Sequence, residues 1–174
     1  MIVIDKSIHE WALSGGVSPY TPEMVNPASL DLRWSGLFRE TFDGNFRYTV
    51  GRSSGAWTKA EEAKTMLLHP GKLYMLDTLE TVIIPDDWAG LLELKSSVAR
   101  LGITLLNNGY FDPGYKGTAT IILENRAPWM IEINKNTRLV QMILYICTNK
   151  PDKTYQETGR YINVQEPQLA IKEK

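Results

Sequence analysis

The sequence predicts an all-β protein that folds as a single domain. Short apolar runs recur along the 174 residues at the spacing of strands, and turn residues separate them. Apolar residues make up 43% of the chain, which is enough for a core, and no internal repeat, linker or low-complexity segment divides it. Residues 1–174 are therefore expected to form one sandwich, barrel or jelly roll.

The N-terminal segment is expected to form a short helix. Asp5 can cap this helix, and the pair Gly15-Gly16 would end it. Ile8, Trp11 and Ala12 would share its apolar face. The segment has no long apolar run, so neither a signal peptide nor a membrane span is indicated, and a cytoplasmic protein is expected.

The first strand is predicted where Leu30, Leu32 and Trp34 alternate with polar residues. Asp31 and Arg33 would lie on its other face. The Gly-Arg-Ser-Ser-Gly run at 51–55 could cradle a phosphate, but its spacing is unspecific and a solvated loop is expected. Further strands are predicted at 46–50, 72–77, 81–84, 91–94, 103–106, 118–123, 129–133 and 139–146.

Charge and residue supply exclude several classes of function. The formal net charge is −1, so no basic excess points to a nucleic-acid partner. Zinc nucleobase deaminases need a set of His and Cys ligands, whereas the chain holds only Cys147, His9 and His69. A Walker-type phosphate loop is absent from the sequence. A single cysteine allows no intrachain disulfide, and Cys147 is expected to be a core residue in a reducing compartment.

A candidate phosphate-binding segment lies at 95–100. Lys95 and Arg100 supply cations, and Ser96 and Ser97 supply hydroxyls. With the backbone N–H groups, they suit the oxygens of a phosphate chain, and arginine adds a planar fork. Taken alone, the segment is more often an ordinary surface loop than a phosphate site.

A candidate base follows on a turn bracketed by glycines, Gly109-Tyr-Phe-Asp112-Pro-Gly114-Tyr-Lys-Gly117. Pro113 and Gly114 favour a defined turn, so the Asp112 carboxylate is well placed as a general base or as a carboxylate linked to a metal. An Asp that merely begins a turn is the alternative interpretation. The two segments together are more specific than either alone.

Together these segments resemble the dCTP deaminase and dUTPase superfamily, whose members carry a basic residue with Ser-Ser or Ser-Gly and, further on, a similar turn around an Asp. The resemblance covers the chain from about residue 5 to residue 167. Further motifs that match are Asn26-Pro-Ala-Ser-Leu-Asp31-Leu-Arg33, Leu68-His69-Pro70-Gly71, Thr78-Leu79-Glu80, Pro85-Asp86-Asp87, Arg138-Leu-Val-Gln141 and the tail residues Tyr155, Gly159-Arg160-Tyr161 and Pro167.

The resemblance implies a dUTPase-like distorted β-barrel or jelly roll with a short N-terminal helix, assembled as a homotrimer. A deoxypyrimidine nucleoside triphosphate would bind at each subunit interface, with Mg2+ held through its phosphates and not directly by the protein. The tail, from about residue 150 to residue 174, would close over the site. Neither a nucleic acid nor a membrane is an expected partner.

The resemblance also assigns roles to residues. Asp112 would orient the attacking water, Tyr115 would pack on the deoxyribose, and Tyr161 would close over the nucleotide. Main-chain groups of residues 107–111 would read the base, and Gln141 belongs to the fourth motif. The expected catalytic residues are Asp112, Arg100 and Glu124, and the expected substrate-binding residues are Lys95, Ser96, Ser97, Asn107, Asn108, Tyr110, Phe111, Tyr115, Gln141 and Tyr161.

Three positions depart from the family pattern. Lys95 stands where arginine is usual, and Val164 stands where the tail usually carries glutamine. Most importantly, the deaminase branch places its catalytic glutamate five residues after Gly117, at the position of Ile122. Glu124 shares the strand face of Ile122 but lies about 6.6 Å further along, unless a β-bulge removes the offset.

The favoured function is dUTPase-like release of diphosphate from dUTP, because this reaction needs only Asp112, the cations and Mg2+. The alternative is a zinc-independent dCTP deaminase, with or without dUTPase activity, in which Glu124 supplies the base. The Leu-His-Pro-Gly segment and the tail resemble that branch, and the Gly-rich C-terminal motif of dUTPases is absent. A third interpretation is a nucleotide-binding homologue that has lost catalysis.

Overall fold

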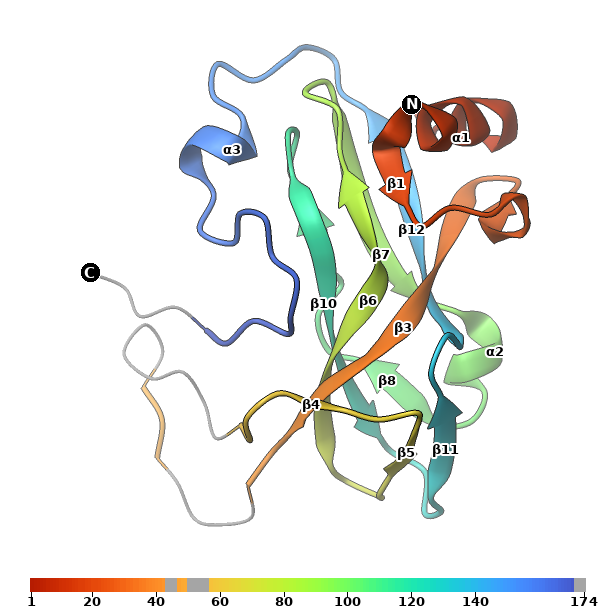
Figure 1. Ribbon diagram of the computed structural model, residues 1–174, viewed down its shortest axis with the longest axis vertical. Coiled ribbons are helices and arrows are strands. Elements are labelled where there is room, and N and C mark those ends of the chain that lie inside the picture. The colour runs from red at the N-terminus through yellow and green to blue at the C-terminus, as the bar shows by residue number, and fades with distance from the viewer. Residues whose placement is uncertain (43–46, 50–56, 171–174) are drawn as a thin grey trace.

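The computed structural model describes residues 1–42, 47–49 and 57–170, and over these residues the chain is mostly β (Figure 1). The strand expected at 46–50 is described only at 47–49, which form no regular element. The loop expected at 51–55 lies outside the described residues. No helix in the described ranges is long and apolar enough to cross a membrane.

The N-terminal helix is present as α1 (Asp5–Trp11), and it continues into a π-helical turn, η1 (Ala12–Gly16). The three apolar residues expected to share one face are buried. The capping expectation is wrong, because the helix begins at Asp5 itself. Ile4 then occupies the N-cap position, and its side chain offers no acceptor. Gly15, at φ 95°, turns the chain out of the helix, as its lack of a Cβ allows.

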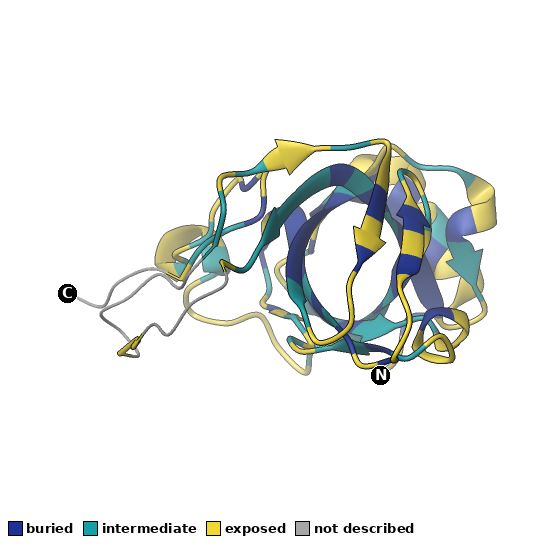
Figure 2. Ribbon diagram, turned by 90° about the horizontal axis from the view of Figure 1, so that it is seen from below, coloured by how far each residue is buried: buried dark blue, intermediate teal, exposed yellow. Residues whose placement is uncertain are grey.

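The strands form one curled sheet and a smaller second sheet. In the curled sheet, antiparallel neighbours follow the order β8-β10-β6-β3-β12-β7-β9, with β1 added to β6 and β2 and β4 added to β3. Figure 2 shows this sheet wrapped into a half-barrel around buried residues. In the second sheet β5 pairs with β11. The strands are β1 (Val17–Ser18), β2 (Val25–Asn26), β3 (Ser29–Glu40), β4 (Glu61–Glu62), β5 (Thr65–Leu68), β6 (Leu73–Ile83), β7 (Trp88–Leu94), β8 (Ile103–Leu105), β9 (Tyr110–Phe111), β10 (Lys116–Asn125), β11 (Ile131–Asn134) and β12 (Arg138–Ile146), and the short helices are η2 (Pro22–Met24), α2 (Ser96–Ala99) and α3 (Tyr155–Thr158).

The two strands expected at 72–77 and 81–84 are one continuous strand, β6. Thr78 and Glu80 separate the two apolar runs in the sequence, yet both are buried. The Glu80 carboxylate accepts a 2.8 Å hydrogen bond from the Arg33 backbone N–H, and it forms an ion pair with the Arg33 guanidinium. This pairing allows a carboxylate in the middle of a strand, although burial raises the pKa of Glu80.

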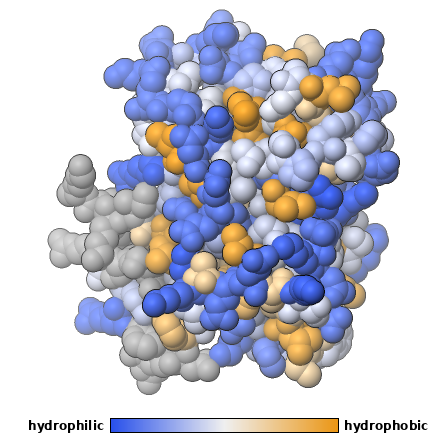
Figure 3. Space-filling model, in the orientation of Figure 1, coloured by the Kyte–Doolittle hydropathy of each residue, from blue (hydrophilic) through white to orange (hydrophobic). Residues whose placement is uncertain are grey.

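The core lies inside the curl. The alternation on β3 places Leu30, Leu32 and Trp34 there, as expected, and all three are fully buried. The Trp34 indole N–H donates a 2.9 Å hydrogen bond to the Leu37 carbonyl, so its polar edge is satisfied within the core. On the outer face seen in Figure 3, apolar side chains form separate patches among hydrophilic ones.

Candidate active site

A pocket lies between strand β10, the loop at 107–111 and the C-terminal tail, which is residues 150–170 as described. Its volume of about 380 Å3 is in the range of small-molecule sites. Most of the side chains around it are apolar or aromatic. The lining residues are Trp57, Met75, Asn107, Gly109, Tyr110, Phe111, Tyr115, Thr120, Ile122, Tyr155, Tyr161, Val164, Gln168 and Ala170.

Strand β10 supplies one wall of the pocket. Thr120 and Ile122 project to the same side because side chains alternate along a strand. Met75 on β6 is the direct cross-strand partner of Ile122 and lines the pocket beside it. The wall where the deaminase glutamate was expected is therefore apolar.

Glu124 does not reach this pocket. From Ile122 to Glu124 the register with β6 is continuous, and the irregularity in β10 falls between Thr118 and Thr120 instead. The bulge that could have moved Glu124 into the place of Ile122 is not present. Glu124 forms a 2.9 Å ion pair with Arg126 and lines a different hollow. Within the single chain, Glu124 therefore does not lie with the expected site residues that line the pocket.

Asn107 ties the loop to the strand. Its side-chain Nδ2 donates to the Thr120 carbonyl at 3.1 Å, and its Oδ1 accepts from the Ile122 backbone N–H at 2.7 Å. Both ends of the side-chain amide are thus engaged with the backbone of β10. These two hydrogen bonds fix the loop at 107–111 relative to residue 122 of β10.

Three aromatic rings form another part of the pocket lining. Phe111 packs edge-on against Tyr115, with ring centroids 4.8 Å apart, and Tyr155 lies 5.4 Å from Tyr115. The Tyr115 hydroxyl donates a 2.5 Å hydrogen bond to the Thr118 carbonyl, and burial raises the pKa of Tyr115, so the ring stays neutral. Helix α3 is held here because Gln156 Nε2 donates to the Gly114 carbonyl at 3.0 Å.

The tail runs along the start of β10 and covers the pocket. The Asn163 N–H donates to the Lys116 carbonyl at 3.0 Å, and the Thr118 N–H donates to the Val164 carbonyl at 2.9 Å. Further along, the Gln168 N–H donates to Thr120 Oγ1 at 3.1 Å. Tyr161, expected to close over the nucleotide, lies within this segment and lines the pocket.

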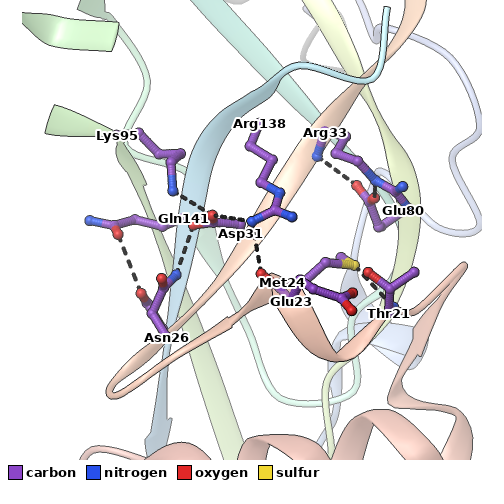
Figure 4. Close-up of polar contacts among 11 residues, drawn as sticks. Thr21, Glu23, Met24, Asn26, Asp31, Arg33, Glu80, Lys95, Arg138 and Gln141 are labelled. Atoms are coloured by element: carbon purple, nitrogen blue, oxygen red, sulfur yellow. Dashed lines mark hydrogen bonds and ion pairs between the residues drawn. The ribbon is translucent and has the colours of Figure 1, made fainter. Parts of the chain in front are cut away.

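A second polar cluster surrounds Asp31, away from the pocket (Figure 4). The Asp31 carboxylate is buried, forms an ion pair with Lys95, accepts a 2.8 Å hydrogen bond from Asn26, and lies 3.6 Å from Arg138. Gln141 belongs to the same cluster, where it accepts a 3.3 Å bond from the Ser29 hydroxyl. Hydrogen bonds and the charge of Arg138 lower the pKa of Glu23, so the two cations of the cluster are balanced by Asp31 and Glu23.

The single chain brings only part of the expected site together. Helix α2 and its flanking residues lie on the opposite side of the half-barrel from α3 and the tail (Figure 1). Ser96, Ser97 and Arg100 are exposed there. The expected substrate-binding residues that line the pocket are Asn107, Tyr110, Phe111, Tyr115 and Tyr161, and those that do not are Lys95, Ser96, Ser97, Asn108 and Gln141.

Asp112 lies on the turn that follows Phe111. Its carboxylate is exposed, and its carbonyl accepts the 3.0 Å bond from the Tyr115 N–H that closes the turn. The side chain is not among those that line the pocket. In the described parts of the chain, no group of three or more His, Cys, Asp and Glu side chains could hold a metal ion.

The family of the chain follows from comparison with known proteins. A model described as dCTP deaminase-like matches residues 2–147. The chain belongs to this family. It is 34% identical over 164 residues to a Corynebacterium kroppenstedtii protein named dCTP deaminase, dUMP-forming, with 89% of this chain and 87% of that protein covered. A Rhodococcus opacus protein of the same name is 35% identical, with 89% and 86% covered.

The fold of this dCTP deaminase-like chain also has a known counterpart. The crystal structure of 2′-deoxycytidine 5′-triphosphate deaminase from Agrobacterium tumefaciens matches with a TM-score of 0.67 at 21% identity, over 83% of this chain and 48% of that chain. The mostly β fold with a short N-terminal helix and the family resemblance are confirmed. The chain is therefore a member of an enzyme family of nucleotide metabolism.

Sequence reasoning missed several pocket residues of this dCTP deaminase-like chain. Thr120 lies two residues before Ile122 and therefore shares its strand face, which could have indicated Thr120 as a pocket residue. Met75 can be found only from the pairing of β6 with β10. Tyr155 was noted only as part of the matching tail. The sequence signal for Tyr155 is the glycine four residues later. The structure explains it, because a Cβ at Gly159 would lie 2.3 Å from the Tyr155 ring.

Proposed function

We propose that this dCTP deaminase-like protein releases diphosphate from a deoxypyrimidine nucleoside triphosphate, with dUTP as the favoured substrate. Ile122 carries the proposal, because it lines the pocket at the position where a deaminase glutamate was expected. Among the described residues that line the pocket, none is a carboxylate. Loss of a general base typically costs deamination a factor of roughly 100 to 10,000.

Hydrolysis needs fewer groups than deamination. Water adds to the α-phosphorus, the bond from this phosphorus to the bridging oxygen breaks, and diphosphate leaves. Asp112 is proposed to orient the water and to accept its proton. The Lys95 and Arg100 cations, with the Ser96 and Ser97 hydroxyls, would bind the phosphate oxygens and stabilise the charge that develops on them.

Recognition of the nucleotide is assigned to the pocket. Because the Asn107 amide is engaged by β10, the base is proposed to be read by main-chain groups of the loop at 107–111. The neutral, buried Tyr115 would pack against the deoxyribose, and Tyr155 extends this aromatic wall. Tyr161 would cover the bound nucleotide as part of the tail.

A homotrimer is part of the proposal. Helix α3 and the tail, which contribute residues to the pocket, lie on the opposite side of one chain from helix α2 in the phosphate-binding segment (Figure 1). A triphosphate could contact both groups only if a second chain supplies one of them, as happens at an interface between copies. The exposed Ser96, Ser97 and Arg100 would then face the phosphates bound in a neighbouring pocket.

Mg2+ is proposed to bind through the phosphates, where it would neutralise negative charge. The residues at 95–100 fit this arrangement, since their cations and hydroxyls can bind phosphate oxygens and none of these side chains is a carboxylate that would hold the metal directly. Their part is to hold the triphosphate, and the part of Asp112 is to hold the water.

The second candidate is deamination of dCTP followed by diphosphate release. It is favoured by the relatives at 34% and 35% identity, whose names are dCTP deaminase, dUMP-forming. In this reaction water adds to the C4 carbon of cytosine and ammonia leaves. A base from outside the described lining of the pocket would have to accept the proton, because Glu124 faces another hollow.

One assay separates the candidates. The purified protein is incubated with dUTP or dCTP and Mg2+, the nucleotides are resolved by chromatography, and ammonia and diphosphate are measured. Conversion of dUTP to dUMP with dCTP untouched supports the first proposal. Formation of dUMP and ammonia from dCTP supports the second. Binding of either nucleotide without turnover would indicate a homologue that has lost catalysis.

A further inference from the structure

Asp77 is a buried carboxyl that the proposed reaction does not use. It lies on β6 directly opposite Thr120 of β10, and only 1% of its surface is exposed. Among the described residues, its Oδ1 is the buried side-chain oxygen that has no hydrogen-bond partner. Because residues opposite each other on neighbouring strands share a face, Asp77 lies on the face that the tail covers.

A single hydroxyl links Asp77 to the tail. The Thr118 side chain donates a 3.1 Å hydrogen bond to the Val164 carbonyl of the tail, and it also interacts with the Asp77 carboxyl. A hydroxyl has one proton to donate. If Asp77 is protonated, it can donate to Thr118 Oγ1, which keeps its own proton for Val164. If Asp77 is ionised, it competes with Val164 for that proton.

Charge acts in the same direction. Besides burial, the negative charge of Glu166 in the tail raises the pKa of Asp77, because two carboxylates repel each other when both are ionised. Arg39 lies 3.7 Å from Glu166 and donates to the Pro167 carbonyl at 3.0 Å, so it anchors the tail through these two residues. Tyr115, the other titratable neighbour, is neutral.

We propose that Asp77 is a positioning residue whose proton holds the tail on β10, so that closure over the pocket depends on pH. The proposal rests on the proposed function only in taking the pocket as the nucleotide site. The coupling between Asp77 and the tail, which runs through the Thr118 hydroxyl, can be tested without nucleotide.

The direction of the effect follows from the environment of the carboxyl. Burial raises the pKa of Asp77 from 3.8 to about 7 in the closed state, whereas a solvated carboxyl keeps a pKa near 3.9. The closed state therefore holds the proton more tightly than the open state. Closure is strongest below pH 4, weakens by at most about tenfold for each pH unit up to pH 7, and is constant above that.

The pH dependence of tail closure is tested by measuring hydrogen exchange of the backbone amides at 162–170 from pH 5.5 to 8.5. The matched control is Asp77→Asn, whose amide cannot ionise and can donate to Thr118 as a protonated carboxyl does. Dividing the wild-type rates by the rates of the variant at the same pH removes the intrinsic pH dependence of exchange. The ratio is expected to rise by up to about tenfold per unit until pH 7 and to level off there. A ratio that stays constant would overturn the proposal.

A second variant keeps the test decisive if Asp77→Asn fails to fold. Glu166 is exposed, and Glu166→Gln removes the facing charge without touching the core, so the transition in exchange is expected to move to lower pH. An unchanged transition would contradict the role of Asp77. If the exchange results are as expected but the KM for dUTP does not change over the same pH range, the role of Asp77 in holding the tail stands and the assignment of the pocket to dUTP fails.

Discussion

Replacing Gly117 with alanine should detach the tail from β10. A Cβ at this position would lie 2.9 Å from the Val164 nitrogen and 3.1 Å from its oxygen, and these are backbone atoms that cannot rotate away. The two nearest backbone bonds, from Asn163 to Lys116 and from Thr118 to Val164, would then be lost. At about 0.5 to 1.5 kcal/mol each, their loss costs about 1 to 3 kcal/mol.

At about 1.4 kcal/mol for each factor of ten, this cost weakens nucleotide binding by roughly 5- to 150-fold if closure contributes fully to affinity. The Kd of a non-hydrolysable dUTP analogue, measured by calorimetry, gives the size of the effect. Gly71→Ala is the control, because Gly71 also has a positive φ, 73°, but a Cβ added there would meet no described atom within 4 Å. Equal Kd values for Gly117→Ala and the wild type, with both proteins folded by circular dichroism, would refute the role of the tail.

Other consequences of the proposed site can be measured in the same assays. Asp112→Asn should leave nucleotide binding nearly intact and lower kcat by roughly 100-fold or more, because an amide cannot accept the proton of water; full activity would remove Asp112 from the mechanism. Arg100→Ala and Asp112→Asn chains, unfolded and refolded together, should recover part of the activity if one site draws on two subunits, and a monomer in light scattering would contradict this. Wild-type protein should release little ammonia from dCTP, and Ile122→Glu should gain release only to the extent that its carboxyl ionises among apolar neighbours. Ammonia release of about 1 per second or faster that vanishes in Glu124→Gln would show that deamination uses Glu124.

The fold was predictable where one periodicity dominated. On β3, the alternation of Leu30, Leu32 and Trp34 identified both the strand and its buried face. The same periodicity argument predicted two strands where β6 is one, because the Arg33 partner of Glu80 lies 47 residues away in the sequence and could not be recognised. Burial of a charge in a strand can be foreseen only when the pairing of strands is known.

The lining of the pocket was predictable only in part. The family resemblance implied one nucleotide site for Tyr115 and Tyr161, and both line the same pocket. Spacing could not show that β10 bulges before Thr120 and not after Ile122, because a bulge depends on the partner strand. Nor could it show that helix α2 and the tail occupy opposite sides of one chain, which is a property of the curled sheet.

The anchoring of Asn107 to β10 makes the position of the loop independent of the side chain at position 122. Its side-chain amide forms hydrogen bonds with the backbone on either side of residue 121, at the Thr120 carbonyl and the Ile122 N–H. A substitution at position 122 replaces a side chain but leaves that N–H in place, so the loop facing the pocket keeps its position. Under the proposed function, the side chain at position 122 decides whether the pocket holds a base for deamination, while the position of the loop that would read the nucleotide does not depend on that side chain.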